Sequence, residues 1–136
     1  MLRTTRDQRG AAAVEFALLL PLLVMLVFGI VEFSVLYNRQ QGLHAAAREG
    51  AREAALPTST QGDIEDRVRE ALEGVLSDAD AAAADISITP NQARPCDLQP
   101  VGTTVVVTVD IEDQVEIPLV DVSAVDITGR GEFRCE

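Results

Sequence analysis

Hydrophobic positions are concentrated in the first quarter of the chain. Residues 11–31 read AAAVEFALLLPLLVMLVFGIV and carry a single charge, that of Glu15. After one more glutamate, a shorter apolar stretch covers residues 33–37. Because a helix of ~20 apolar residues crosses the ~30 Å hydrocarbon core of a bilayer, we predict a transmembrane helix over residues 11–37. Most of the aromatic residues lie here, with Tyr37 where an interfacial aromatic is expected.

Two other structures compete with a transmembrane helix. A buried helix of a soluble domain is disfavoured, because the rest of the chain is too small to cover a helix that is apolar all round. A cleaved secretory signal is also disfavoured, because its apolar core has ~7–15 residues and ends at a small-residue cleavage site. Here the apolar run is longer, and the alanines at 45–47 lie well beyond it.

The charges on either side of the span predict its orientation. Residues 1–10 carry three arginines against one aspartate, whereas arginines and glutamates nearly balance just after residue 37. By the positive-inside rule, we expect 1–10 to be the cytoplasmic leader of a single-pass protein of the inner membrane. The remaining chain is then extracytoplasmic, with a helical stalk over 38–56 and an outer domain over 57–136.

The predicted stalk contains no proline, so the helix can continue past the membrane. Small residues between 45 and 55 permit another helix to approach closely. Its charged residues at 48–53 are expected to form a solvated face with weak pairs one turn apart. We expect His44 to be an ordinary stalk residue rather than a metal ligand.

The pattern beyond residue 57 predicts an α+β unit. Ile64, Val68 and Leu72 recur at helical spacing, and acidic residues occupy the first turn, so we expect an amphipathic helix over 63–77. Residues 79–84 either extend this helix or form a loose connection. Alternating and β-branched segments then predict three or four antiparallel strands, the last being one strand or two. These segments are 86–89, 104–109, 115–117 and 125–135.

Composition narrows the possible functions. The formal net charge is -11, and residues 63–136 hold 17 acidic residues against five arginines. A nucleic-acid partner is therefore not expected, because a polyanion needs a basic footprint. The acidity is explained by solubility, with docking to a basic partner or weak calcium binding as alternatives. We assign no metal, no cofactor and no catalytic residue, since no G-x-S-x-G, H-E-x-x-H or calcium-loop motif occurs.

Cys96 and Cys135 are the only cysteines, and both fall on the predicted oxidising side of the membrane. An outer domain with one aromatic residue has a thin core and benefits from a covalent link. We therefore expect a disulfide between them, with two free thiols as the alternative. Its loop of about 40 residues corresponds to ~4 kcal/mol in the chain-entropy model.

Glu15 is the residue of the span that most needs an explanation. A carboxylate costs ~2.5–3.5 kcal/mol at the centre of an apolar helix and less toward its ends. Glu15 therefore either reaches the headgroup region or has a functional partner. The choice depends on whether the span begins near Arg9 or near Phe16.

The residues before Glu15 resemble a type IV prepilin processing site. A short basic leader ends in Arg9-Gly10, and an apolar helix follows with Glu at its fifth position. The resemblance implies that an aspartic membrane peptidase cuts the bond between Gly10 and Ala11 on the cytoplasmic face and that the helix is retained. The new α-ammonium of Ala11 then needs a carboxylate, because an uncompensated charge there is costly. Glu15 of a neighbouring subunit can supply it and so set the register between packed helices.

Residues 9–55 as a whole resemble the TadE-like family, the pseudopilins of tight-adherence (Flp) pilus systems. The shared pieces are Arg-Gly, Val-Glu-Phe-Ala, a proline-interrupted leucine run, Gly-Ile-Val-Glu-Phe and Ala-Arg-Glu-Gly-Ala-Arg, in that order. Major Flp pilins are much shorter and often carry Glu-Tyr where this chain has Glu-Phe. These two differences indicate a minor pseudopilin.

The resemblance implies a structural role in pilus assembly rather than an enzyme. The helix would pack with pilin-type subunits, and the outer domain would present a recognition surface. The implied partners are the prepilin peptidase, the major Flp-type pilin, companion TadF/TadG-like proteins and the inner-membrane pilus platform. The alternative is an uncleaved single-pass membrane anchor whose outer domain binds something unrelated to pili.

Overall fold

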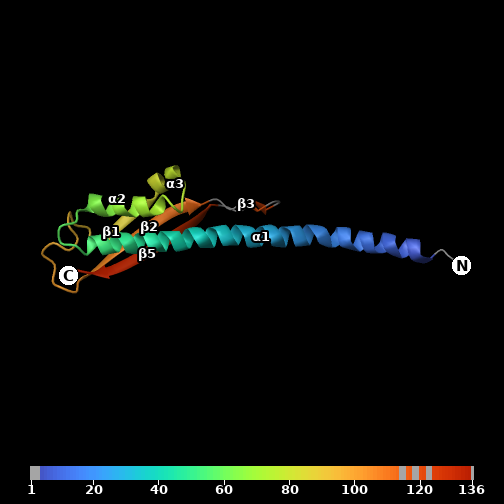
Figure 1. Cartoon of the computed structure of the whole chain (residues 1–136), viewed down its shortest axis with the longest axis horizontal. Helices are drawn as coiled ribbons and strands as arrows, with labels where there is room; N and C mark the ends of the chain where they lie inside the picture. The colour runs from blue at the N-terminus through green and yellow to red at the C-terminus, as the bar shows by residue number, and fades with distance from the viewer. Residues whose placement is uncertain (1–3, 114–115, 118–119, 122–123, 136) are drawn as a thin grey trace.

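A computed structural model describes residues 4–113, 116–117, 120–121 and 124–135, with side chains described over 10–113 and 124–135. One long helix projects far beyond a small α+β unit, and the last strand of that unit ends beside the far end of the helix (Figure 1). The elements in chain order are α1 (Thr4–Ala54), α2 (Gln61–Leu72), α3 (Asp78–Ala83), β1 (Asp85–Thr89), β2 (Thr104–Asp113), β3 (Glu116–Ile117), β4 (Val120–Asp121) and β5 (Val125–Arg134).

Helix α1 has 51 residues and continues past Pro21, which gives a length of ~76 Å at ~1.5 Å per residue. Every large hydrophobic side chain from Val14 to Val35 is exposed. An apolar window of this helix has a mean hydropathy of 2.7 and no buried residue, so α1 is long and apolar enough to cross a membrane. The expected long apolar N-terminal helix is thereby confirmed.

The outer unit is a three-stranded antiparallel sheet covered on one face. The strand order is β1-β2-β5, and β3 and β4 form a separate two-stranded pair. Residues of β2 alternate between buried positions and half-buried or exposed ones, as the β-branched run predicts. The C-terminal half of α1 and helix α2 pack on the buried face (Figure 1). The expected α+β class is therefore confirmed.

Two glycines, one on α1 itself and one on β5, allow α1 to pack closely against its neighbours. A Cβ at Gly129 would lie 2.4 Å from the carbonyl carbon of Leu43, and one at Gly50 would lie 2.3 Å from Cγ2 of Val68. Because Gly129 has no side chain, β5 can lie against the backbone of α1. Because Gly50 has none, Val68 of α2 can lie against α1. The segment expected as a stalk, residues 38–56, therefore also forms one wall of the core. We call the part of the chain that packs together, from Leu36 onward, the head.

Several expected elements differ in length from the observed ones. The helix expected over 63–77 is α2, which ends at Leu72, just before Glu73 and Gly74. The residues around 79–84 form a separate helix, α3, whose N-cap is Ser77. The final segment is one strand rather than two, and β2 runs four residues past the expected end. Of the strand expected over 115–117, β3 covers the last two residues, and residue 115 lies outside the described part.

Candidate processing and helix-packing site

Gly10 and Ala11 lie on the part of α1 that stands clear of the head. Both residues are exposed, and a Cβ at Gly10 would meet no atom within 4 Å. The bond between them is therefore open to another protein. Gly10 is also an intrinsically weak point of the helix, because glycine disfavours helix by ~1 kcal/mol relative to alanine.

Glu15 lies four residues after Ala11 on the same helix, and its side chain is exposed. Residues four apart share a helix face, and helical side chains tilt toward the N-terminus. A carboxylate at Glu15 therefore points back along the face that carries Ala11. An ammonium created at Ala11, in this chain or in an adjacent one, could approach it along that face.

No basic residue occurs between Gly10 and Asn38. The first arginine after the apolar stretch is Arg39, and it forms an ion pair with the buried Asp113 at the end of β2. The apolar stretch therefore supplies no cation of its own for Glu15.

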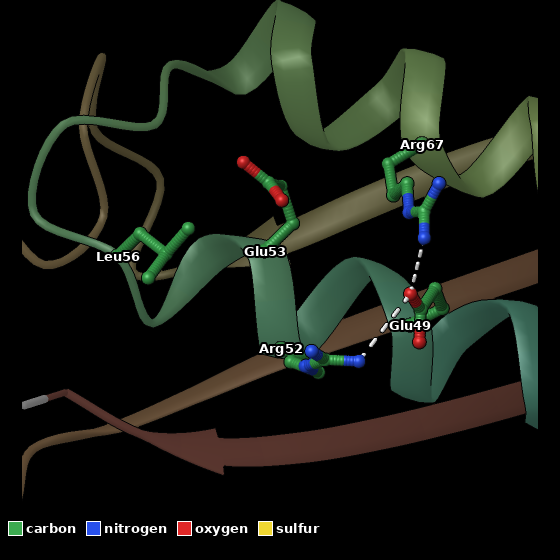
Figure 2. A pocket seen from close by; sticks show the side chains of 5 residues that line it. All are labelled: Glu49, Arg52, Glu53, Leu56 and Arg67. Atoms are coloured by element: carbon green, nitrogen blue, oxygen red, sulfur yellow. Dashed lines mark hydrogen bonds and ion pairs between the residues drawn. The ribbon is translucent and has the colours of Figure 1, made fainter.

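A small groove of ≈ 250 Å³ lies between α1 and α2 in the head (Figure 2). Nη2 of Arg67 on α2 lies 2.6 Å from Oε1 of Glu49 on α1, and Arg52 lies 3.8 Å from the same oxygen. The hydrogen bond from Arg67 holds the pKa of the Glu49 carboxyl below its ordinary value, while the pKa of Arg67 is raised. Glu53, on the same rim, accepts a 2.6 Å hydrogen bond from Ser59.

Three charges of this groove, those of Glu49, Arg52 and Arg67, are thus paired with one another. The expected solvated face at 48–53 does contain a pair one turn apart, that of Glu49 and Arg52. The shorter ion pair crosses to Arg67 of α2, which local spacing could not predict. Groups paired in this way hold two helices together.

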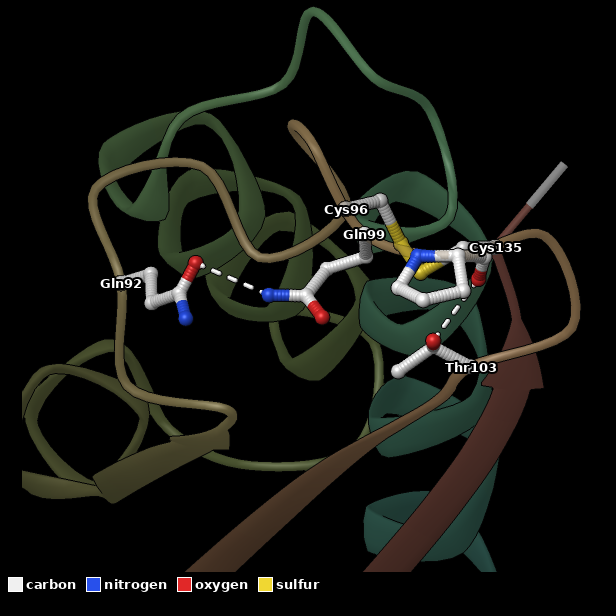
Figure 3. Close-up of a disulfide and its surroundings, with 6 residues drawn as sticks. Gln92, Cys96, Gln99, Thr103 and Cys135 are labelled. Atoms are coloured by element: carbon white, nitrogen blue, oxygen red, sulfur yellow. Dashed lines mark hydrogen bonds between the residues drawn. A yellow bond between two sulfur atoms is a disulfide. The ribbon is translucent and has the colours of Figure 1, made fainter.

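Cys96 and Cys135 are joined by a disulfide with a Cα–Cα distance of 5.5 Å (Figure 3). Both are buried, and the backbone N–H of Cys135 donates to the carbonyl of Thr103 at 2.8 Å. The link joins the loop between β1 and β2 to the end of β5. It closes the end of the head farthest from the apolar part of α1 (Figure 1).

His44 has a role that the sequence does not reveal. Its Nδ1 accepts a 3.0 Å hydrogen bond from the backbone N–H of Arg130, which lies 86 residues away on β5. The N–H that is satisfied here belongs to an edge strand, and unsatisfied edge groups are open to pairing with other chains. His44 therefore closes part of that edge.

Among the described residues, no group of three or more His, Cys, Asp and Glu side chains could hold a metal ion. The processing residues and the head groove lie on separate parts of the molecule, because residues 10–15 project beyond the head (Figure 1). The structure brings Ala11 and Glu15 onto one helix face and joins Cys96 to Cys135.

Comparison with known proteins finds a family match for the N-terminal part of the chain. Residues 10–52 match the family model described as "TadE-like protein". No curated protein and no solved structure matches the chain. The match begins at Gly10 and ends near the last turn of α1, so it covers the apolar helix and the part that packs in the head. The chain thus carries a TadE-like segment over residues 10–52, which associates it with Tad pilus systems.

Proposed function

We propose that this protein is a membrane-anchored pseudopilin that contributes to assembly of a tight-adherence (Flp) pilus. The observation that carries the proposal is the TadE-like match over a helix whose apolar residues from Val14 to Val35 are all uncovered. A helix that is apolar all round needs lipid or other apolar helices around it. Both surroundings are available to a pilin-type subunit.

The residues at the start of the helix support processing. Gly10 and Ala11 are exposed, and Glu15 lies one turn beyond on the same face as Ala11. We propose that a prepilin peptidase cuts between Gly10 and Ala11 on the cytoplasmic side. The ammonium that results adds to the positive end of the helix dipole, so a carboxylate near it is stabilising. Glu15 of an adjacent pilin-type subunit would supply that carboxylate and fix the axial position of the two helices.

The head supports a recognition role. Its core includes Leu43, Ala47 and Ala51 of α1, all fully buried, so the head and the helix are one packed body. A movement of the helix within an assembly would therefore move the head with it. Partners such as the major pilin, TadF/TadG-like proteins and the inner-membrane platform would meet a surface held at a fixed height above the bilayer.

Complementation tests the proposal. In a host strain from which this chain has been deleted, we expect few or no surface pili by electron microscopy and restoration by the wild-type chain. Glu15→Val should insert into the membrane without restoring pili, whereas the apolar swap Leu18→Val should restore them. Normal piliation of the deletion strain would overturn the function, and normal piliation with Glu15→Val would overturn the role of that carboxylate.

A further inference from the structure

One hydrogen bond at the edge of the sheet fixes which backbone groups of each strand face outward. The N–H of Arg130 on β5 donates to His44 of α1, so it points away from β2. In an antiparallel ladder, hydrogen-bonded pairs alternate with pairs whose backbone groups point away from each other. The residues on either side, Gly129 and Gly131, therefore bond to β2. Thr108, which lies opposite Arg130, must then direct its N–H and C=O toward β1.

The same alternation continues from β2 to β1. Thr108 lies opposite Ser87 in the register, so these two residues form a hydrogen-bonded pair. Ile86 and Ile88, on either side of Ser87, therefore direct their N–H and C=O groups to the outer edge of β1. Among the described residues, no turn, loop or cap hydrogen bond involves the backbone of either isoleucine. Strand β1 is thus an open edge of the sheet.

A groove lies beside this edge. It has a volume of ≈ 410 Å³, with β1 on one side and α2 on the other. At one end of it, Nε2 of Gln61 donates to Oδ1 of Asn91 at 2.7 Å, and the strand stops before Pro90. The side chain of Ile88 is buried, and that of Ile86 is partly buried against the core. The hydrophobic core therefore reaches the groove at the open edge.

We propose that β1 is the docking site for an extended segment of a different protein, which adds a further strand to the sheet. The backbone of that segment would bond to Ile86 and Ile88, the mode of recognition known as strand addition. Its alternate side chains would enter the groove beside α2 and meet the two isoleucines, so they should be apolar. The side chains between them would lie on the face of Ser87, which is exposed, and should be polar.

A second copy of this chain does not fit the edge in a membrane. Gly129 packs on Leu43 and Gly131 packs on Ala47, so β5 runs in the direction of α1. Strands β1 and β5 are both antiparallel to β2, so β1 runs in that direction too. Copies anchored in one bilayer share the direction of α1 and cannot pair their β1 strands antiparallel. The edge at β5 is partly closed by His44. This exclusion rests on the proposed spanning role of α1, whereas the open edge of β1 does not.

Amide hydrogen exchange of the detergent-solubilised full chain tests the docking site. The probe is a synthetic peptide that alternates valine and threonine and carries lysine at both ends. Two derivatives are N-methylated, one on every valine and the other on every threonine. A bound strand turns one of these two sets of N–H groups toward β1 and the other toward solvent. Only one derivative should therefore lose binding.

We expect the unmodified peptide, at saturation, to slow exchange of the N–H groups of Ile86 and Ile88 by roughly tenfold or more. The N–H of Val101, in the loop before β2, should be unaffected. Binding by side chains alone would not distinguish the two methylated sets in this way.

Variants of the edge give a second measurement. Ile86→Pro removes an outward N–H without removing a bond to β2, and Ile86→Val is the matched control that keeps the N–H. We expect the proline variant to bind the peptide roughly fivefold more weakly, the weight of one neutral hydrogen bond. The valine variant should bind like the wild type. Circular dichroism would check folding, and if the proline variant unfolds, the methylated peptides decide.

The inference is wrong if the peptide protects neither isoleucine, or if both methylated derivatives bind or both fail. Protection of Ile86 and Ile88 that rises with the concentration of the chain alone would show that a second copy occupies the edge, and would overturn the choice of partner. These outcomes are independent of pilus assembly, which the deletion strain tests separately.

Discussion

The α-carbon of Gly131 lies directly against the backbone of Ala47. A Cβ built at Gly131 would be 2.3 Å from both the carbonyl carbon and the carbonyl oxygen of Ala47. Neither element can yield easily, because one is a hydrogen-bonded turn near the C-terminal end of α1 and the other is paired along β2. This contact joins α1 to the sheet without an intervening side chain.

A methyl group at this contact should weaken the head. We expect Gly131→Ala to lower the free energy of unfolding by ~1–3 kcal/mol, the usual cost of overpacking. Denaturant unfolding of the detergent-solubilised chain would measure it. Gly74→Ala is the matched control, because a Cβ there meets no atom within 4 Å. Equal effects of the two substitutions would contradict the close approach of sheet and helix.

The hydrogen bond from Arg130 to His44 should contribute measurably to stability. His44→Ala leaves the Arg130 N–H without its acceptor, and we expect a loss of ~1 kcal/mol in the free energy of unfolding. His44→Asn can place an acceptor close to the position of Nδ1 and should recover part of that loss. Gln41→Ala, one turn away and exposed, is the control. An Asn variant no more stable than the Ala variant would argue against the hydrogen bond.

The ion pair between Glu49 and Arg67 predicts a pH dependence. The hydrogen bond from Arg67 lowers the pKa of Glu49 from its ordinary value of 4.5. The folded chain therefore binds this proton less readily than the unfolded chain does. The stabilisation is present above pH 4.5 and is lost as the pH falls through the lowered pKa.

Glu49→Gln tests that dependence. The wild type should be more stable than this variant near neutral pH, and the difference should shrink in acid. Gln41→Ala, an exposed position on α1 that carries no titratable group, should show no such convergence. Thermal unfolding across the acid range would record both. A constant difference between wild type and Glu49→Gln at every pH would sink the assignment.

The disulfide should supply a large part of the stability of the head. Cys96 and Cys135 are 39 residues apart, and closing such a loop corresponds to ~4 kcal/mol in the chain-entropy model. We expect the double variant Cys96→Ser, Cys135→Ser to unfold at a clearly lower concentration of denaturant. On gels, the wild-type chain isolated from cells should migrate differently with and without reductant. Identical mobility in the two samples would show that the thiols are free.

Local patterns predicted the elements whose residues interact with near neighbours. The apolar run of α1 and the stripe of Ile64, Val68 and Leu72 on α2 were both readable, since burial repeats with the helical period. The break between α2 and α3 was harder to place. Residues 79–84 fit both a continued helix and a connection, whereas the structure has a separate helix, α3, with its N-cap at Ser77.

Contacts between distant segments were not readable in the same way. Nothing near His44 or Glu49 indicates a partner on β5 or α2, because those partners are brought near only by the fold. The sequence does contain one indication of such a contact, in the spacing of two glycines. Gly129 and Gly131 are two residues apart, and glycines at that spacing on a strand mark close approach of another backbone.

The prediction of the candidate site came mostly from the sequence. Gly10, Ala11 and Glu15 stand apart from the head, so packing adds little to what their spacing shows. The structure adds that Ala11 and Glu15 share a helix face and that nothing in the head covers either one. The proposed role of these residues depends on a covalent change, the cleavage of the bond between Gly10 and Ala11.

Intact-mass analysis of the chain, purified from cells with and without a functional prepilin peptidase, tests that event most directly. The account predicts a mature protein that begins at Ala11 when the peptidase is present and retains residues 1–10 when it is absent. Gly10→Ala should retain the leader in both. A wild-type chain that keeps residues 1–10 beside an active peptidase would contradict the pseudopilin account and favour an uncleaved membrane anchor.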